Sequence, residues 1–335
     1  MRIISEYGSD DIAKVYVAQM REDASARADS RRFMVEFVES VQPPIPREQK
    51  WVLIVSSMFG CPIRCRMCDA GGEFAGRLTA DEILAQIDHM VRLRYPDGRV
   101  PSKKFKIQFA RMGEPSLNPE VLEAMDRLPQ MYDAPGLQAS MSTVAPGTKP
   151  AREFFHKLIA VKERHYAHGR FQLQFSIHTT DITLRDDLIP TKKWPLEEIS
   201  AYGARFARPD DGDKKVTLNF APAVGYPIDA RVLRELFDPS LFMIKLTPLN
   251  PTVRGHEESL RSAIDPHDRR TSDSIIQPLK REGFDVVLSI GELEENRIGS
   301  NCGQFIQRAL NAKERPSESY ELDRYRTAEN RAERN

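Results

Sequence analysis

Three cysteines lie close together in the chain, in the spacing C-x3-C-x2-C. They are Cys61, Cys65 and Cys68, and the sequence holds one other cysteine, Cys302. Three thiolates at this spacing can bind three irons of a [4Fe–4S] cluster and leave the fourth iron without a protein ligand. Because an open iron can bind a substrate or cofactor directly, the spacing predicts redox chemistry at such a cluster.

Zinc and a disulfide are the alternatives for this cysteine motif. A structural zinc site takes four protein ligands, usually in two pairs, and the sequence supplies no second pair and no nearby histidine. A disulfide is not expected, because the first residues do not resemble a signal peptide and the cysteines form no even framework. We therefore expect an oxygen-sensitive cluster in a cytoplasmic protein.

The composition argues against membrane proteins and nucleic-acid binders. The 335 residues include 49 basic and 49 acidic side chains, so the formal net charge is zero. Nucleic-acid-binding proteins usually carry an excess of positive charge, and no stretch approaches the roughly 20 apolar residues of a membrane span. The short basic runs at 103–106, 192–193 and 214–215 are interpreted as solvated ends of elements. We expect no membrane or DNA partner, and a small-molecule substrate in preference to RNA.

Strand and helix patterns alternate from about residue 50 to residue 290. Apolar runs typical of strands occupy 51–57, 105–110, 137–143, 171–178, 215–222 and 241–249. Helical patterns occupy 79–94, 119–128, 150–166, 196–208, 229–238 and 270–283. The first helix opens with Thr79 and Glu82 in the arrangement of a capping box. The alternation predicts an α/β fold with a parallel sheet, closed into an incomplete (β/α)6 barrel.

The barrel would place the cysteine motif at its mouth. The motif directly follows the predicted strand 51–57, and active sites of such barrels lie at the carboxyl ends of the strands. The element pattern and the motif therefore point to the same end of the sheet.

Small extensions are expected on both sides of the barrel. Residues 1–50 would form an N-terminal extension, with a short helical cap over 1–29 and a strand and turn over 30–50 that could pair with the first barrel strand. The barrel itself would cover 51–292. Residues 293–335 would hold the loop with the fourth cysteine and a polar, helical tail.

Beyond the cysteine motif, the chain resembles the RlmN/Cfr class of radical S-adenosylmethionine (SAM) methyltransferases, which methylate an adenine of ribosomal RNA. The likeness covers most of residues 36–306 and consists of short segments in a fixed order. Besides the motif, these segments are 55–57, 77–83, 112–118, 142–143, 175–178, 185–186, 248–251 and 301–304. The resemblance implies a [4Fe–4S] cluster and SAM as cofactors.

The resemblance gives each matched residue a role. The three cysteines of the motif would hold the cluster. Gly113, Glu114 and Pro115 would receive the amino group of SAM, since a carboxylate is a natural partner for an ammonium. The SAM carboxylate and ribose would be contacted by Ser142, Ser176, His178 and Asn250. The alternatives are ordinary strand positions for the two serines and a buried, satisfied histidine for His178.

Two further residues would take part in covalent chemistry. In the class that the chain resembles, the cysteine matched by Cys302 is methylated by one SAM. A radical from a second SAM then takes hydrogen from that methyl group, and the carbon adds to an sp2 carbon of the substrate. Glu39 matches a glutamate proposed to remove the substrate proton, although the match needs two extra residues before Ile45. The alternatives are an inert buried thiol and an outward-facing strand residue.

The chain departs from this class at residue 54. The RNA methyltransferases carry a second, mobile cysteine seven residues before the first cluster cysteine, and this cysteine releases the product by forming a disulfide. Here the position is Ile54, which offers no nucleophile. Arg111 replaces a glycine, the segment 288–295 carries three glutamates in place of basic residues, and the N-terminal region is short and neutral. These departures predict a divergent member whose substrate is not 23S rRNA.

The sequence thus predicts a radical SAM enzyme that transfers a one-carbon unit through Cys302 and receives electrons from a flavodoxin- or ferredoxin-type donor. Two alternatives stay open within this chemistry. One is direct hydrogen abstraction from a small molecule without methylation, and the other is RNA adenine methylation completed by an external thiol. The third alternative is a non-catalytic RNA- or metal-binding relative, whose RNA binding would weaken steeply with salt.

Overall fold

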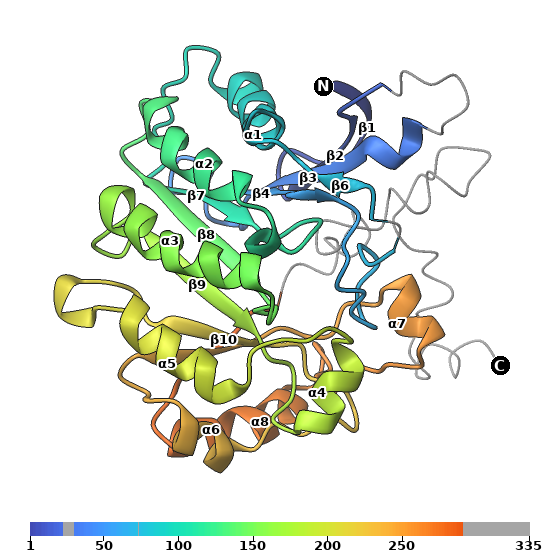
Figure 1. The fold of residues 1–335 in the computed structure, drawn as a ribbon, viewed down its shortest axis with the longest axis vertical. Helices are drawn as coiled ribbons and strands as arrows, with labels where there is room; N and C mark the ends of the chain where they lie inside the picture. The colour runs from blue at the N-terminus through green and yellow to red at the C-terminus, as the bar shows by residue number, and fades with distance from the viewer. Residues whose placement is uncertain (23–29, 73, 291–335) are drawn as a thin grey trace.

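The computed structural model describes residues 1–22, 30–72 and 74–290, and its central feature is one ten-stranded sheet (Figure 1). Across the sheet, its strands are β1 (Arg2–Gly8), β2 (Ala13–Gln19), β3 (Met34–Ser40), β4 (Lys50–Val55), β7 (Lys104–Phe109), β8 (Leu137–Thr143), β9 (Phe171–Ser176), β10 (Val216–Phe220), β11 (Phe242–Leu246) and β12 (Asp285–Leu288). The strands from β4 to β12 are parallel, whereas β1, β2 and β3 pair in antiparallel fashion. β1 and β12 end the sheet without pairing to each other, so the barrel is open, as predicted.

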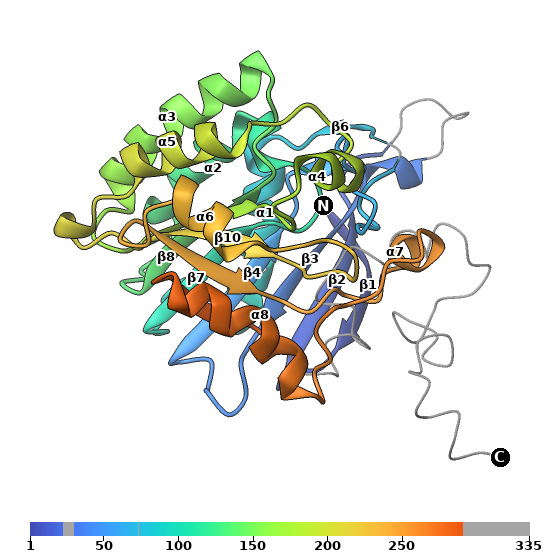
Figure 2. The same cartoon turned by 90° about the horizontal axis from the view of Figure 1, so that it is seen from below.

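Helices connect consecutive parallel strands. They are α1 (Ala80–Arg94), α2 (Glu120–Arg127), α3 (Lys149–His165), α4 (Ile182–Leu188), α5 (Leu196–Phe206), α6 (Ala230–Leu236), α7 (Val253–Glu257) and α8 (Arg269–Arg281). Short 3-10 turns occupy Ser30–Phe33, Pro115–Leu117, Leu128–Gln130 and Pro209–Asp211. In two perpendicular views, α3 and α5 lie along the same side of the sheet (Figures 1 and 2). The predicted alternation of strands and helices is confirmed, and α4 and α7 are additions to it.

Alternation along each strand divides the sheet into two faces. Trp51 and Leu53 of β4, and Phe105 and Ile107 of β7, join the helices in one large apolar core. Burying side chains of this size contributes roughly 1.5–3 kcal/mol each. Because neighbouring side chains on a strand point to opposite faces, the residues between them, such as Lys106, lie on the other face, which we call the inner face.

The predicted capping box at the start of α1 is confirmed. The Oγ1 atom of Thr79 accepts a hydrogen bond from the N–H of Glu82 at 3.2 Å, and the carboxylate of Glu82 accepts one from the N–H of Thr79 at 2.9 Å. The two bonds satisfy donors that a helix start otherwise leaves unpaired. The helix that follows the cysteine loop is therefore fixed at its first turn.

The helical cap predicted over 1–29 is wrong for the part of it that the structure describes, which forms the β1–β2 hairpin. Val15, Tyr16 and Val17 are buried on both faces of β2, and β-branched and aromatic residues favour such strands. The strand predicted within 30–50 is confirmed, because β3 pairs with β4 and aligns Val38 with Ile54. The N-terminal strands therefore extend the barrel sheet.

The last parallel strand, β12, was not predicted. In β12, the exposed Asp285 and Val287 alternate with half-buried Val286 and Leu288, so the apolar signal is short.

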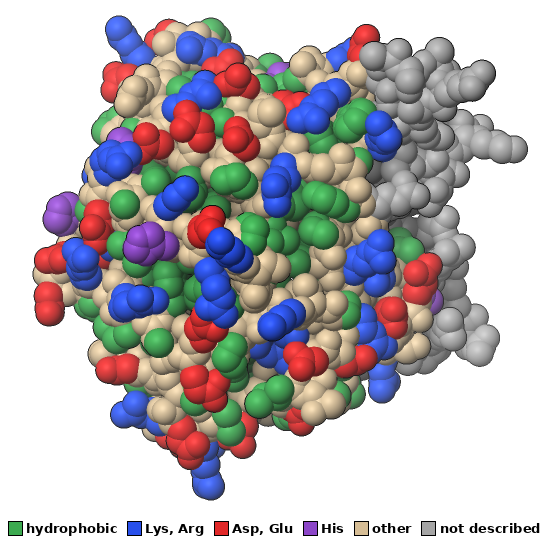
Figure 3. Space-filling view, in the orientation of Figure 1, with side chains coloured by type: hydrophobic (Ala, Val, Ile, Leu, Met, Phe, Trp, Pro, Cys, Tyr) green, Lys and Arg blue, Asp and Glu red, His purple; other side chains and the backbone are tan. Residues whose placement is uncertain are grey.

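The polar tail and the loop of Cys302, predicted over 293–335, lie outside the described residues. Among the helices that the structure describes, none is long and apolar enough to cross a membrane. Basic and acidic side chains are interspersed on the face shown in Figure 3.

Candidate active site

The structure brings most of the predicted site residues to one edge of the sheet, where the parallel strands end. The cysteine loop follows β4, Gly113 and Glu114 follow β7, and Asn250 follows β11. Ser142 lies at the end of β8 and Ser176 is the last residue of β9. Since parallel strands of a barrel share their carboxyl edge, residues far apart in the sequence meet there. Cys302 lies outside the described residues.

The cysteine loop is held at both of its ends. Two short strands, β5 (Met58–Phe59) and β6 (Gly76–Arg77), pair in antiparallel fashion and bracket the loop. Within it, the carboxylate of Asp69 accepts hydrogen bonds from the N–H groups of Val253 at 3.1 Å and Arg254 at 2.9 Å, at the start of α7. The hydroxyl of Thr252 donates to the carbonyl of Met67 at 2.9 Å. The loop is thereby joined to the segment that carries Asn250.

The three thiols are half-buried and influence one another electrostatically. Burial and, to a lesser extent, the neighbouring Cys68 raise the pKa of Cys61 to about 12. Burial also raises the pKa of Cys65 and of Cys68, while the guanidinium of Arg111 acts to lower that of Cys68. Thiolates in this loop therefore need positive charge beside them, and bound metal supplies it.

A donor set of three thiols in one loop fits a [4Fe–4S] cluster. Within the described ranges, no three His, Cys, Asp or Glu side chains gather as the ligands of a single metal ion. A cluster differs because it distributes its thiolates over separate irons. Backbone N–H groups near Cys61 and Cys68 act to lower the pKa of these thiols, an interaction that also favours ligand sulfur in its thiolate form.

Gly113 and Glu114 form a buried turn after β7. Gly113 has φ +97°, and a Cβ atom there would lie 2.6 Å from the Cβ of Met58, so only glycine fits. The carboxylate of Glu114 accepts hydrogen bonds from Ser116 Oγ at 2.7 Å, Thr143 Oγ1 at 2.5 Å and the Val144 N–H at 3.0 Å. Burial raises its pKa and these bonds oppose the rise. The arrangement is a pre-oriented carboxylate able to receive a cation.

His178 follows β9 in a left-handed backbone conformation, with φ +67°. Its Nδ1 accepts a hydrogen bond from the N–H of Ala221 at 3.0 Å, which places the proton of the neutral ring on Nε2. Burial lowers the pKa of His178 to about 4. Nearby, the side chain of Gln174 donates to Ser142 Oγ at 3.3 Å, and Ser176 is paired in register with Asn219.

The buried His178 predicts a specific pH dependence of stability. Its folded pKa of about 4 lies below the ordinary value of 6.5, so the unfolded chain binds the proton first as pH falls. The stabilisation is complete above pH 6.5 and is lost as pH drops towards 4. Between pH 7.5 and 5.5, the wild type should lose roughly 1 kcal/mol of unfolding free energy that His178→Gln does not lose.

Urea denaturation followed by circular dichroism at the two pH values measures this difference. His156→Gln, which changes an exposed histidine of α3, should keep the wild-type pH dependence. Equal pH dependence in the wild type and His178→Gln would show that His178 is not the group responsible.

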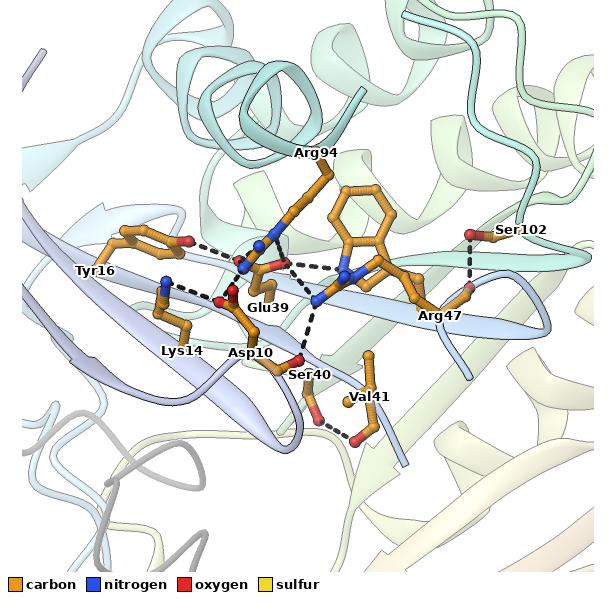
Figure 4. Close-up of polar contacts among 10 residues, drawn as sticks. Asp10, Lys14, Tyr16, Glu39, Ser40, Val41, Arg47, Arg94 and Ser102 are labelled. Atoms are coloured by element: carbon orange, nitrogen blue, oxygen red, sulfur yellow. Dashed lines mark hydrogen bonds and ion pairs between the residues drawn. The ribbon is translucent and has the colours of Figure 1, made fainter. Parts of the chain in front are cut away.

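Glu39 lies on the helix-covered face of the sheet, with 2% of its surface exposed (Figure 4). Its carboxylate accepts hydrogen bonds from Arg94 at 2.7 Å, Tyr16 at 2.6 Å and the indole of Trp51 at 3.2 Å. Tyr16 and Trp51 belong to the core beneath the helices. The structure therefore does not bring Glu39 to the face of the cysteine loop.

We expect Glu39→Gln to lower the unfolding free energy by about 3–5 kcal/mol, because it leaves the guanidinium of Arg94 without its buried partner. Asp10→Asn removes a more exposed carboxylate from the same guanidinium and should cost less than about 1 kcal/mol. Guanidinium chloride denaturation compares the two variants. A stable Glu39→Gln protein that cleaves SAM but fails to turn over substrate would instead support the predicted proton-accepting role.

Glu36 is the acidic residue that sequence reasoning missed. It lies three residues before Glu39 on β3, alternates with the core residues Val35 and Phe37, and therefore faces the inner side. The guanidinium of Arg111 contacts its Oε1 at 2.8 Å, with side-chain exposures of 2% and 0%. Since Arg111 also influences Cys68, this ion pair lies near the cysteine loop. The alternation of apolar residues along 34–40 could have identified the face.

Ile54 packs on the same inner face. It contacts a small apolar cluster that also includes Val38 and Met112, with Cys61 and Cys68 packed against it. The residue that occupies the position of the second cysteine in the resembled class therefore packs against the same cluster as two cysteines of the loop. Its side chain contributes packing there and no thiol.

No model of a known protein family matches the chain. The dual-specificity RNA methyltransferase RlmN of Wolinella succinogenes is 28% identical over 312 residues, covering 90% of this chain and 83% of that protein. A probable dual-specificity RNA methyltransferase RlmN of Synechococcus sp. is 35% identical over 270 residues, covering 78% and 71%. The crystal structure of a radical SAM methyltransferase from Sphaerobacter thermophilus aligns with TM-score 0.62 and 22% identity, covering 90% of this chain and 80% of that chain. The chain therefore has the same fold as that crystal structure.

Proposed function

Since the chain belongs to the RlmN family of radical SAM methyltransferases, we propose that it binds a [4Fe–4S] cluster through Cys61, Cys65 and Cys68. When bound, such a cluster supplies the electron for reductive cleavage of SAM. Support comes from the three half-buried thiols in one loop at the carboxyl edge of the sheet. The loop is held by β5, β6 and the start of α7.

The chain's own residues would orient SAM along this edge. The carboxylate of Glu114 would receive its ammonium, because the hydrogen bonds from β8 hold that carboxylate in place. Its carboxylate and ribose would be contacted by Ser142, Ser176, His178 and Asn250. Support comes from their common position at the ends of β8, β9 and β11.

In the proposed reaction, Cys302 carries the one-carbon unit. Its thiolate would accept a methyl group from SAM and present that carbon to an sp2 carbon of the substrate. The sequence match gives Glu39 as the group that removes the substrate proton, whereas Glu36 lies on the inner face with the cysteine loop. Electrons would come from a flavodoxin- or ferredoxin-type donor.

We further propose that the substrate is not ribosomal RNA, with a small molecule favoured. The observation that carries this step is Ile54, which packs on the inner face against the same apolar cluster as Cys61 and Cys68. A cysteine here could attack the methyl-bearing sulfur and release the product, but an isoleucine cannot. Release of the product from Cys302 would then require an external thiol, a group of the substrate or another elimination.

RNA adenine methylation completed by an external thiol is the second candidate. The observation in its favour is that the relatives are named RNA methyltransferases. The two candidates differ in their need for RNA and for added thiol. In the second, methylation of an rRNA fragment would rise when dithiothreitol is added.

The test is anaerobic turnover of the reconstituted protein with SAM and dithionite, with and without an rRNA fragment and dithiothreitol. One-carbon transfer requires S-adenosylhomocysteine in addition to 5′-deoxyadenosine, whereas direct hydrogen abstraction gives 5′-deoxyadenosine alone. Our proposal expects both products and unmethylated RNA in every arm. Methylated RNA would reject the non-RNA substrate, and absence of both products would reject the radical enzyme.

A further inference from the structure

Five lysines lie on or beside the inner face of the sheet. They are Lys50 of β4, Lys104 and Lys106 of β7, Lys214 just before β10, and Lys245 of β11. On β7, Phe105 and Ile107 face the helices, so Lys104 and Lys106 face inward. On β11, Ile244 and Leu246 belong to the same core, which places Lys245 on the inner face. We call these five residues the inner lysine cluster.

The side chains of this cluster converge across the sheet. Lys106 of β7 donates a hydrogen bond to the side-chain oxygen of Gln172 on β9 at 3.0 Å. Lys214 donates to the side-chain oxygen of Gln138 on β8 at 2.7 Å. Lys50 lies near enough to Lys245 to affect its ionisation, although four strands separate β4 from β11. The curvature of the sheet therefore brings lysines from distant strands together.

Like charges in this cluster oppose one another. The pKa of Lys106 is lowered to about 7, mainly by burial and to a lesser extent by the charges of Lys245, Lys104, Lys214 and Lys50. Burial lowers the pKa of Lys214 to about 8, and Lys104 adds to the effect. Collecting several ammonium groups in a half-buried space costs free energy, which an anion placed among them would recover.

The side-chain partners of Lys106 and Lys214 are neutral amides. Within the part of the chain that the structure describes, no carboxylate forms a salt bridge with Lys104, Lys106, Lys214 or Lys245. The neighbouring Lys215 differs, since its ammonium pairs with Asp285 at 2.6 Å. The sheet can therefore offer a carboxylate to a lysine, and it does so outside the cluster.

One member of the cluster, Lys245, lies beside the residues proposed to bind SAM, whereas Lys50 and Lys104 begin β4 and β7 and lie toward the amino end of the sheet. Asn219 of β10 is paired in register with Ser176 on one side and with Lys245 on the other. SAM itself carries one carboxylate, one ammonium and one sulfonium, so its net charge is positive and it does not match several lysines. Phosphate groups carry up to two negative charges each and are common partners of lysine.

We propose that the inner lysine cluster binds phosphate groups of the substrate, held on the inner face of the sheet between its amino end and the SAM-binding carboxyl edge. This inference rests on the proposed function for its statement that the bound molecule is the substrate. The phosphates could belong to a small phosphorylated molecule or to the backbone of an oligonucleotide. Both present the same oxyanions to the lysines.

The experiment measures binding by the full-length, cluster-containing protein under anaerobic conditions, without SAM or reductant. The probes are inorganic pyrophosphate, by calorimetry, and a fluorescent 12-nucleotide RNA, by anisotropy. Lys106→Met and Lys245→Met should each weaken the binding at least roughly tenfold, because each removes a charge from the cluster. Lys103→Met, which changes an exposed lysine just before β7, should bind like the wild type.

A charge-retaining variant and a stability measurement keep the test independent of folding damage. Lys245→Arg should bind within a few fold of the wild type, while Lys245→Met without ligand should raise the thermal midpoint by relieving repulsion. If pyrophosphate binds, the phosphates are assigned to a small molecule. If the RNA binds and pyrophosphate does not, they are assigned to an oligonucleotide. Absence of binding by both probes, or equal binding by the wild type and both methionine variants, would overturn the proposal. Because SAM cleavage is not measured, this failure is distinct from failure of the proposed radical chemistry.

Discussion

Replacing Cys65 with alanine is expected to abolish reductive cleavage of SAM. The cluster needs all three thiolates of the loop, since each binds one iron. Iron content after anaerobic reconstitution should fall from about four to less than about one atom per chain, and 5′-deoxyadenosine should no longer form. Iron analysis, the visible absorption of the cluster and chromatography of the SAM products measure these changes.

Cys302→Ala is the matched control for the loss of Cys65. It removes a thiol from the same chain but leaves the three cysteines of the loop, so iron content and visible absorption should match the wild type. 5′-Deoxyadenosine should still form, while S-adenosylhomocysteine should disappear. A Cys65→Ala protein that keeps the cluster and cleaves SAM normally would contradict the assignment of the loop.

Replacing Glu114 with glutamine is expected to weaken SAM binding about 30-fold or more, because a buried, hydrogen-bonded charge pair is worth roughly 2–5 kcal/mol when one partner is removed. The variant should also lose about 1–3 kcal/mol of unfolding free energy. Its amide would direct an N–H group at the donors of Thr143, Ser116 or Val144. Calorimetric titration with SAM and chemical denaturation give the two values.

Thr143→Val separates these two effects. It removes one hydrogen bond to Glu114 and keeps the negative charge, so it should cost about 1 kcal/mol of stability. SAM affinity should stay within a few fold of the wild type. If Glu114→Gln binds SAM as tightly as Thr143→Val does, Glu114 supports the turn and does not bind the ammonium.

Local sequence signals predicted the core of the fold because they act over short distances. The apolar alternation at 51–57 gave the strand before the cysteine loop, observed as β4, and Thr79 with Glu82 gave the start of α1. Both signals depend on residues that lie close together in the sequence, within one or two helical turns or a few strand positions. The edge at which the site residues gather followed from the parallel order of the strands.

The errors arose where tertiary contacts decide the structure. The β2 strand is apolar on both faces because Tyr16 and Ala18 pack in the helix-covered core while Val15 and Val17 pack in the small inner cluster, so it lacks the alternation of a strand with one solvated face. The basic runs were interpreted as solvated element ends, yet Lys106 and Lys214 are half-buried and bonded to glutamines of other strands. Sheet curvature brings those strands together, and it cannot be predicted from the sequence of a short segment.

The site itself was only partly accessible from the sequence. The matched segments named Gly113, Glu114 and Ser142, which the structure places at the carboxyl edge of the sheet together with the cysteine loop. The match at Glu39 depends on a two-residue insertion, and the structure places that side chain on the opposite face from Glu36. A shift of an odd number of residues along a strand reverses the face, so an uncertain alignment cannot choose between the two glutamates.

One labelling experiment shows whether Cys302 carries the transferred carbon. The reconstituted protein is incubated anaerobically with SAM whose methyl group is deuterated, then digested and examined by mass spectrometry. We expect a deuterium-labelled one-carbon modification on the peptide that contains Cys302, together with S-adenosylhomocysteine. An unmodified Cys302 peptide in protein that has formed 5′-deoxyadenosine would contradict the claim.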